Sequence, residues 1–98
     1  MSAATLLPQL LELLCDLYDD TEGFLDRTDD PQLWYNRGYA NGVIHALDRL
    51  GYARQITGVL DRDTDDLIQG HERLSWGKAY RHGWEMGREE TYDVMEVT

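Results

Sequence analysis

The sequence predicts an all-α protein, a compact bundle of four to five helices in a single domain over residues 1–98. Apolar residues recur at steps of three and four over most of the chain, as they do on one face of a helix. Pro and Gly stand where helices would begin and end, and no stretch alternates between apolar and polar residues as a strand does. Because 42% of the residues are hydrophobic, the chain can form a core and is not a disordered acidic tail.

The first helix is predicted over residues 5–27. Thr5 would cap it, and Pro8 would fall in the first turn, where a missing N–H costs little. Gly23 weakens a helix by about 1 kcal/mol relative to Ala, so a break near residue 20 is the alternative. Leucines form the apolar face of this helix. The opposite face carries the carboxylates Glu12, Asp16, Asp19, Asp20, Glu22 and Asp26.

The second helix has clear signals at both ends. Asp30 is a good N-cap, Pro31 fits the first helical position, and Gly51 fits the position just after the last turn. Apolar residues cover about half of its circumference, which is typical of a central helix.

Three further helical segments are predicted. A short helix spans residues 52–60, and the apolar residues between positions 67 and 74 indicate another short one. The last helix runs over residues 76–95, with Ser75 as its cap.

A weak internal repeat relates "YNRGYANGVIHAL" to "YRHGWEMGREETY" at an offset of 45 residues. The shared pattern is Tyr-x-x-Gly-aromatic-x-x-Gly. Glycines four apart lie on one helix face, where a neighbouring helix can approach closely. The two helices therefore either cross each other at these glycines or offer them to a ligand or partner helix. The repeat also suggests a pseudo-twofold arrangement of two helical hairpins.

The net charge of −10 disfavours direct binding to nucleic acid, so the natural partners are basic surfaces. Residues 10–30 hold eight acidic residues and one basic residue. Exposed helices usually mix charges, so this segregation predicts an interface; the alternative is a solvated face that limits aggregation. Trp34 is an aromatic anchor for a partner or a packing residue. The candidate partner-binding residues are Glu12, Asp16, Asp19, Asp20, Glu22, Asp26, Asp29, Asp30 and Trp34.

Residues 61–72, "DRDTDDLIQGHE", resemble the calcium loop of an EF-hand. Asp66 stands at the sixth loop position, where that family has Gly. No metal is our main expectation, because an acidic loop that caps the next helix explains the same residues. The calcium ligands of the alternative would be Asp61, Asp63, Asp65 and Glu72.

No motif for catalysis or for a cofactor is present. The single cysteine, Cys15, lies among acidic residues that disfavour a thiolate, and the three histidines share no short metal spacing. We therefore expect no enzymatic activity and no cofactor. No apolar run is long enough to span a membrane and no signal peptide is evident, so we expect a cytoplasmic protein.

In size, charge and helical class the whole chain resembles the small inhibitors of host defence encoded by phages and mobile elements, chiefly anti-CRISPR and antirestriction proteins. The resemblance does not rest on a shared motif. It implies a non-enzymatic inhibitor in the host cytoplasm, a DNA mimic whose acidic helix face occupies a basic nucleic-acid-binding surface, as on a CRISPR effector. The alternatives are the calcium-binding module and a homodimer that buries the wide apolar face of residues 30–51.

Overall fold

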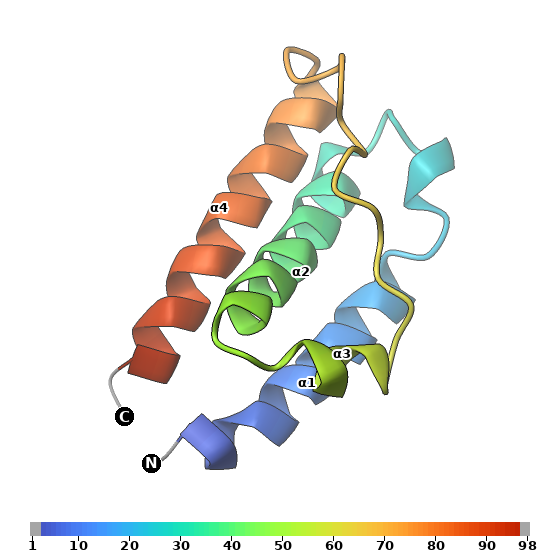
Figure 1. Ribbon diagram of the computed structural model, residues 1–98. Coiled ribbons are helices and arrows are strands. Elements are labelled where there is room, and N and C mark those ends of the chain that lie inside the picture. Colours follow the sequence, from blue (N-terminus) through green and yellow to red (C-terminus); the bar gives the residue numbers. More distant parts are fainter. Residues whose placement is uncertain (1–2, 97–98) are drawn as a thin grey trace.

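The computed structural model describes residues 3–96, and the fold is all-α, as predicted. No strand occurs in this range. Figure 1 shows the long helices lying together, with a short helix and a long connection beside them. The elements are α1 (Ala3–Asp20), the 3-10 helix η1 (Phe24–Asp26), α2 (Pro31–Arg49), α3 (Ala53–Thr57) and α4 (Ser75–Glu96).

Helices α2 and α4 run parallel and touch backbone to backbone (Figure 1). A Cβ atom built on Gly38 would lie 2.0 Å from the carbonyl oxygen of Tyr80, and one on Gly42 would lie 2.0 Å from that of Trp84. Only glycine fits at either position. The two helices therefore cross at their glycines, as one reading of the repeat predicted. The other reading, a docking place for a ligand or partner helix, is wrong because the chain itself fills the seam.

The same contacts recur in the reverse direction. Cβ atoms on Gly83 and Gly87 of α4 would lie 2.1 Å from the carbonyl oxygens of Tyr35 and Tyr39. Exchanging the two helices by the 45-residue offset converts the contact of residues 38 and 80 into that of residues 83 and 35. The α2–α4 pair thus obeys a local pseudo-twofold, and such close approach also permits weak Cα–H···O=C bonds.

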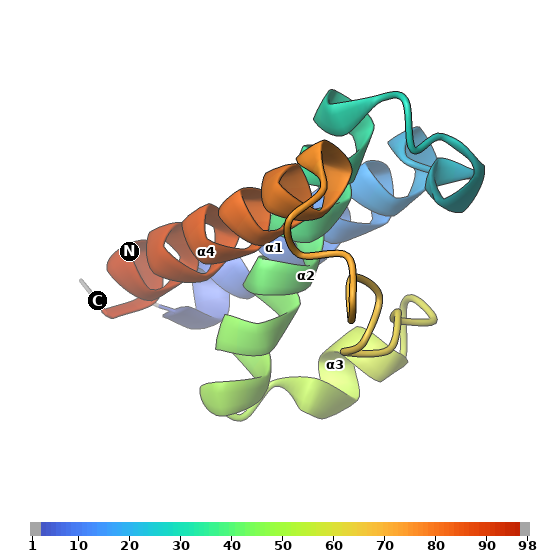
Figure 2. The same cartoon turned by 90° about the horizontal axis from the view of Figure 1, so that it is seen from above.

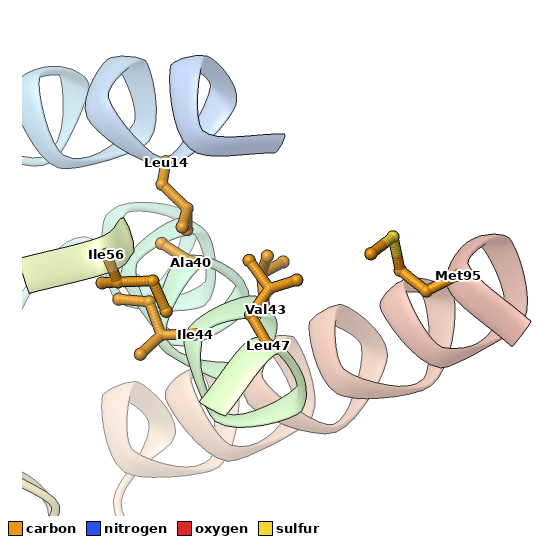
Figure 3. Close-up of a cluster of buried hydrophobic side chains, with 7 residues drawn as sticks. All are labelled: Leu14, Ala40, Val43, Ile44, Leu47, Ile56 and Met95. Carbon is orange, nitrogen blue, oxygen red and sulfur yellow. The ribbon is translucent and has the colours of Figure 1, made fainter. Parts of the chain in front are cut away.

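Helix α1 packs against α2 through side chains. Figure 3 shows Leu14 reaching from α1 towards Ala40 of α2. Val43, Ile44 and Leu47 of α2 are each at most 1% exposed. Burial of one such aliphatic side chain stabilises the fold by about 1.5–3 kcal/mol. The wide apolar face of α2 is therefore covered within the chain, which leaves little of it for the predicted homodimer contact; the homodimer itself stays a prediction.

The end of α1 differs from the prediction. The helix ends at Asp20 rather than near residue 27, so the alternative of a break near residue 20 is confirmed. Gly23 takes a φ of 80°, a left-handed conformation that favours glycine, and Phe24 then turns into a cluster of buried aromatic rings. At the other end the helix is already formed at Ala3, so Thr5 lies inside it and is not its N-cap.

Both predicted ends of α2 are confirmed. The side chain of Asp30 accepts the backbone N–H of Leu33 at 3.2 Å, and Pro31 is the first helical residue. Gly51, just beyond the C-cap, has a φ of 98°.

Residues 50–74, which we call the connection, carry the chain back so that α4 can run parallel to α2. Figure 2 shows the connection, which includes α3, to one side of the long helices α1, α2 and α4. Helix α3 falls inside the predicted range of 52–60. The predicted helix between residues 67 and 74 is wrong, because the chain makes turns there and Gly70 takes a φ of 81°. Ser75 is the first residue of α4 rather than its cap.

Candidate functional site

Seven of the predicted partner-binding carboxylates are exposed, and we call them the acidic surface. One of them, Asp29, pairs with Arg27 at 3.6 Å, and both side chains are more than half exposed. Such a pair contributes about 1 kcal/mol at most. The other six have no ion pair within residues 3–96. The acidic surface consists of Glu12, Asp16, Asp19, Asp20, Glu22, Asp26 and Asp29.

The acidic surface is not the single helical stripe that the sequence predicted. Because α1 ends at Asp20, its carboxylates extend about 12 Å along the axis from Glu12, where a helix to residue 26 would have spanned about 21 Å. Glu22 lies in the turn that follows, and Asp26 ends η1. The eighth acidic residue, Asp30, is half-buried and serves as the N-cap of α2.

Trp34 is a core residue, so its predicted role as a partner contact is wrong. Its side chain is 1% exposed, and its indole N–H donates to the carbonyl oxygen of Arg27 at 3.1 Å. Its ring centroid lies 4.8 Å from that of Phe24 and 4.4 Å from that of Trp76. The alternative reading of Trp34 as a packing residue is confirmed.

A buried arginine lies at the centre of the molecule. Arg37 is 9% exposed, and its guanidinium forms two hydrogen bonds to Asp63, at 2.7 and 3.2 Å. Nη1 donates to the carbonyl oxygen of Tyr18 at 3.1 Å and to the hydroxyl of Thr21 at 2.8 Å. The guanidinium also stacks on the Tyr18 ring, 3.6 Å from its centroid. A buried charge of this kind is tolerated because nearly all of its donors are satisfied.

Asn41 extends this network to α4. Its amide nitrogen donates to Asp63 at 2.9 Å and to the hydroxyl of Tyr80 at 2.8 Å. Its amide oxygen accepts the hydroxyl of Tyr18, which in turn accepts the backbone N–H of Asp63 at 3.1 Å. Burial raises the pKa of Tyr18, and burial raises that of Tyr80 to about 12, so both hydroxyls keep their protons. The network therefore joins α1, α2, α4 and the connection.

The EF-hand alternative for residues 61–72 is wrong. Helix α3 ends at Thr57 and α4 begins at Ser75, so no helices frame the loop. Asp63 is held by Arg37 and Asn41. In the described part of the chain, no group of three or more His, Cys, Asp or Glu side chains is placed to hold a metal ion, and this covers the proposed ligands Asp61, Asp63, Asp65 and Glu72.

A cavity of about 380 Å³ lies between α2, α4 and the connection. Part of the polar network forms its floor: Asn41, Asp63 and Tyr80. Its apolar wall consists of Ile44, Ile68 and Trp84. The half-buried or exposed residues at its mouth include His45, Arg62, Asp65 and Arg81.

A shallower groove of about 340 Å³ lies on the opposite face of α2, between α1 and α4. Its floor includes Tyr39, which is about 200° around the helix from Asn41 of the cavity. Leu13 of α1 and Val94 of α4, in its walls, are 39% and 45% exposed. The wall on α4 also carries two carboxylates, Glu90 and Asp93.

A hydrogen bond joins Tyr39 in the floor of this groove to the wall on α4. Its hydroxyl donates to the carboxylate of Glu90. Burial and this hydrogen bond raise the pKa of Tyr39 to about 12.

The sequence did not predict the buried network around Arg37, the cavity or the groove. A signal for the network was present, because Arg37 and Asn41 are polar residues at the edge of the broad apolar face of a central helix. A charge at such a position implies a buried partner. The partner, Asp63, lies 26 residues away in an acidic loop, and no local pattern distinguishes it from its neighbours.

No helix within residues 3–96 has the length and apolarity needed to cross a membrane. Comparison of the chain with models of known protein families, with curated proteins and with solved structures finds no match.

Proposed function

We propose that the chain is a non-enzymatic protein-binding inhibitor whose acidic surface docks on a basic, nucleic-acid-binding surface of a partner complex. The observation that carries this proposal is the concentration of unpaired acids in one segment. Six carboxylates of the acidic surface, all within residues 12–26, have no cation partner in residues 3–96, and Arg27 is the one basic residue among residues 10–30. Unpaired acids also occur elsewhere, as at Asp61, Asp66 and Glu72, but there basic residues such as Arg62 and Arg73 stand among or beside them in the sequence. A surface that needs only hydration is better served by mixed charges.

The position of two of these acids also supports the proposal. Asp19 and Asp20 are the last residues of α1, and no basic residue is present in its last turn. The partial negative charge at a helix C-terminus disfavours carboxylates there. These residues therefore cost stability in the free protein, which is common where a surface serves binding rather than folding.

The mechanism is exclusion of nucleic acid by charge complementarity. Carboxylates docked on the Lys and Arg residues of a nucleic-acid channel would occupy the places of phosphates. Complementary charge mainly raises the association rate and makes binding sensitive to salt. Inhibitors of CRISPR effectors and restriction enzymes are the class of protein that this mechanism fits.

Affinity also needs an apolar anchor, and the groove provides a place for one. Leu13 is partly exposed in its wall, and on α1 the carboxylates of Asp20 and Asp16 lie about 20° and 60° from it around the helix axis. Glu90 and Asp93 stand on the opposite wall. A large apolar side chain flanked by Lys or Arg, as on a basic amphipathic helix, complements this arrangement.

The test is an affinity pull-down from the native host at low and high salt, followed by titration of the captured partner. We expect the triple variant Asp16→Asn, Asp19→Asn, Asp20→Asn to lose binding while its helix content stays unchanged. The control variant Asp61→Asn, Asp66→Asn, Glu72→Gln changes the net charge equally on the connection and should keep binding. Wild-type affinity of the first triple variant for a nucleic-acid-binding partner would refute the proposal.

A further inference from the structure

We propose that the cavity between α2, α4 and the connection binds a small organic monocarboxylate with an apolar body and a neutral hydrogen-bond acceptor at its far end. This site lies on the face of α2 opposite the groove and does not depend on the protein-binding function.

The floor of the cavity offers one uncommitted polar group. Both oxygens of Asp63 accept hydrogen bonds from Arg37, and one of them also accepts from Asn41. The amide of Asn41 is fully engaged as well. Tyr80 is 8% exposed, and its hydroxyl accepts from Asn41, but within residues 3–96 nothing accepts its own hydrogen. A buried O–H without an acceptor is costly, so a ligand acceptor at this point is favourable.

The acceptor at the floor must be neutral. Asp63 lies in the floor beside Tyr80, since the Asn41 amide nitrogen donates to both. Arg37 already balances the Asp63 carboxylate. A second anion brought to this depth would face that carboxylate without a free cation.

The mouth of the cavity, in contrast to its floor, offers several free hydrogen-bond donors. Arg62 uses one guanidinium nitrogen to pair with Asp48, and Arg81 uses its Nε towards Glu85 at 3.5 Å, so each keeps further N–H groups. The ring of His45 contacts Trp84, with 4.8 Å between centroids, and its nitrogens make no hydrogen bond within the described chain. These donors favour a carboxylate.

The volume of the cavity and the charge of its lining residues restrict the class of ligand further. Asp65 at the mouth disfavours a doubly charged anion such as a phosphate monoester. Between mouth and floor, Ile44, Ile68 and Trp84 favour an apolar body. A volume of about 380 Å³ lies near the lower end of known ligand sites, which fits a body of one or two rings.

The experiment titrates three matched probes, 4-hydroxyphenylacetate, phenylacetate and 4-hydroxyphenylacetamide, into the full chain and follows backbone and indole N–H signals by NMR. We expect saturable shifts at Ile68 and Trp84. The hydroxyl-bearing acid should bind about five- to tenfold more tightly than phenylacetate, and more tightly than the neutral amide by a similar factor. Absence of saturable shifts at these residues, or equal binding of all three probes, would overturn the proposal.

Two variants test the contacts one at a time. Tyr80→Phe should remove the preference for 4-hydroxyphenylacetate over phenylacetate, and Arg81→Gln should reduce the preference for the acid over the amide. Arg81 is exposed, so its variant is expected to fold and remains decisive if Tyr80→Phe unfolds. An unchanged acid preference in Arg81→Gln would overturn the assignment by itself, and so would an unchanged hydroxyl preference in a folded Tyr80→Phe.

Discussion

Helix α2 packs against α4 and against α1 through different kinds of contact. Against α4 it presents glycines, and the backbones touch with no room for a methyl group. Against α1 it presents aliphatic side chains and Arg37, whose partners come from three other parts of the chain. The first contact fixes the position of the backbone, whereas the second fills space with side chains. The outer surface of α1 is thus able to carry unpaired charge without disturbing the seam.

The largest effect is expected at the seam. In Gly42→Ala the new Cβ would lie 2.0 Å from the carbonyl oxygen of Trp84, so the helices must separate. We expect the free energy of unfolding to fall by more than about 4 kcal/mol, or the chain not to fold. Denaturant unfolding followed by circular dichroism measures this.

Gly58→Ala is the matched control for the seam. The nearest atoms to its Cβ would lie 3.6 Å away, and its φ is −73°. This variant should change stability by about 0.5 kcal/mol or less. Equal stability of the two alanine variants would show that the seam tolerates separation.

The second-largest loss of stability is expected where Arg37 of α2 contacts α1. Arg37→Leu leaves the carboxylate of Asp63 without its cation and Thr21 without its donor. Loss of one partner of a buried pair costs about 3 kcal/mol or more. Arg81→Gln breaks an exposed pair and should cost about 0.5 kcal/mol or less. Thermal unfolding of both variants gives the comparison, and similar costs would mean that the buried network contributes no more than a surface pair.

Alkaline pH should weaken the contacts of Tyr39 and Tyr80, the two tyrosines whose pKa values are raised to about 12. The pKa of Tyr80 rises from 10.0 to about 12 on folding, mainly by burial, and that of Tyr39 rises equally. A raised folded-state pKa gives stability that is complete below pH 10 and is lost as the pH passes from 10 to 12. For Tyr80 the loss should be on the order of 2 kcal/mol.

The measurement combines unfolding at pH 9 to 12 with tyrosinate absorbance at 295 nm. Tyr80→Phe should be less sensitive to alkaline pH than the wild type. A wild-type stability that stays constant up to pH 12 would contradict the pKa shifts.

The smallest predicted effect is a gain in stability rather than a loss. The triple variant Asp16→Asn, Asp19→Asn, Asp20→Asn should be more stable than the wild type by about 0.5–1 kcal/mol at low salt, because it removes repulsion and unfavourable charges at the end of α1. High salt should cancel the gain. Melting temperatures at two salt concentrations test this, and a lower melting temperature of the variant would mean that these acids stabilise the fold.

What the sequence could predict was local. The fold class, the ends of α2 and the crossing at the glycines all follow from neighbouring residues, such as Asp30 with Pro31 or Gly38 with Gly42. Periodicity alone extended α1 past Gly23, because the apolar pattern continues through Phe24, which in fact turns away into another cluster.

The candidate site was predicted only in part. The exposed acids follow from composition, and six of them were found without partners in residues 3–96. Trp34 was misread as a partner contact because its surroundings come from distant segments, and the EF-hand alternative for residues 61–72 arose for the same reason. Asp63 looks like a metal ligand until Arg37 is placed beside it, 26 residues away along the chain.

The parallel course of α2 and α4 has a consequence for folding kinetics. Up-and-down helical hairpins form early because their contacts are close in sequence, whereas here the tightest contacts join residues about 45 positions apart. The nucleus must therefore close the whole connection before the glycines meet. We expect this chain to fold more slowly than an antiparallel bundle of equal length.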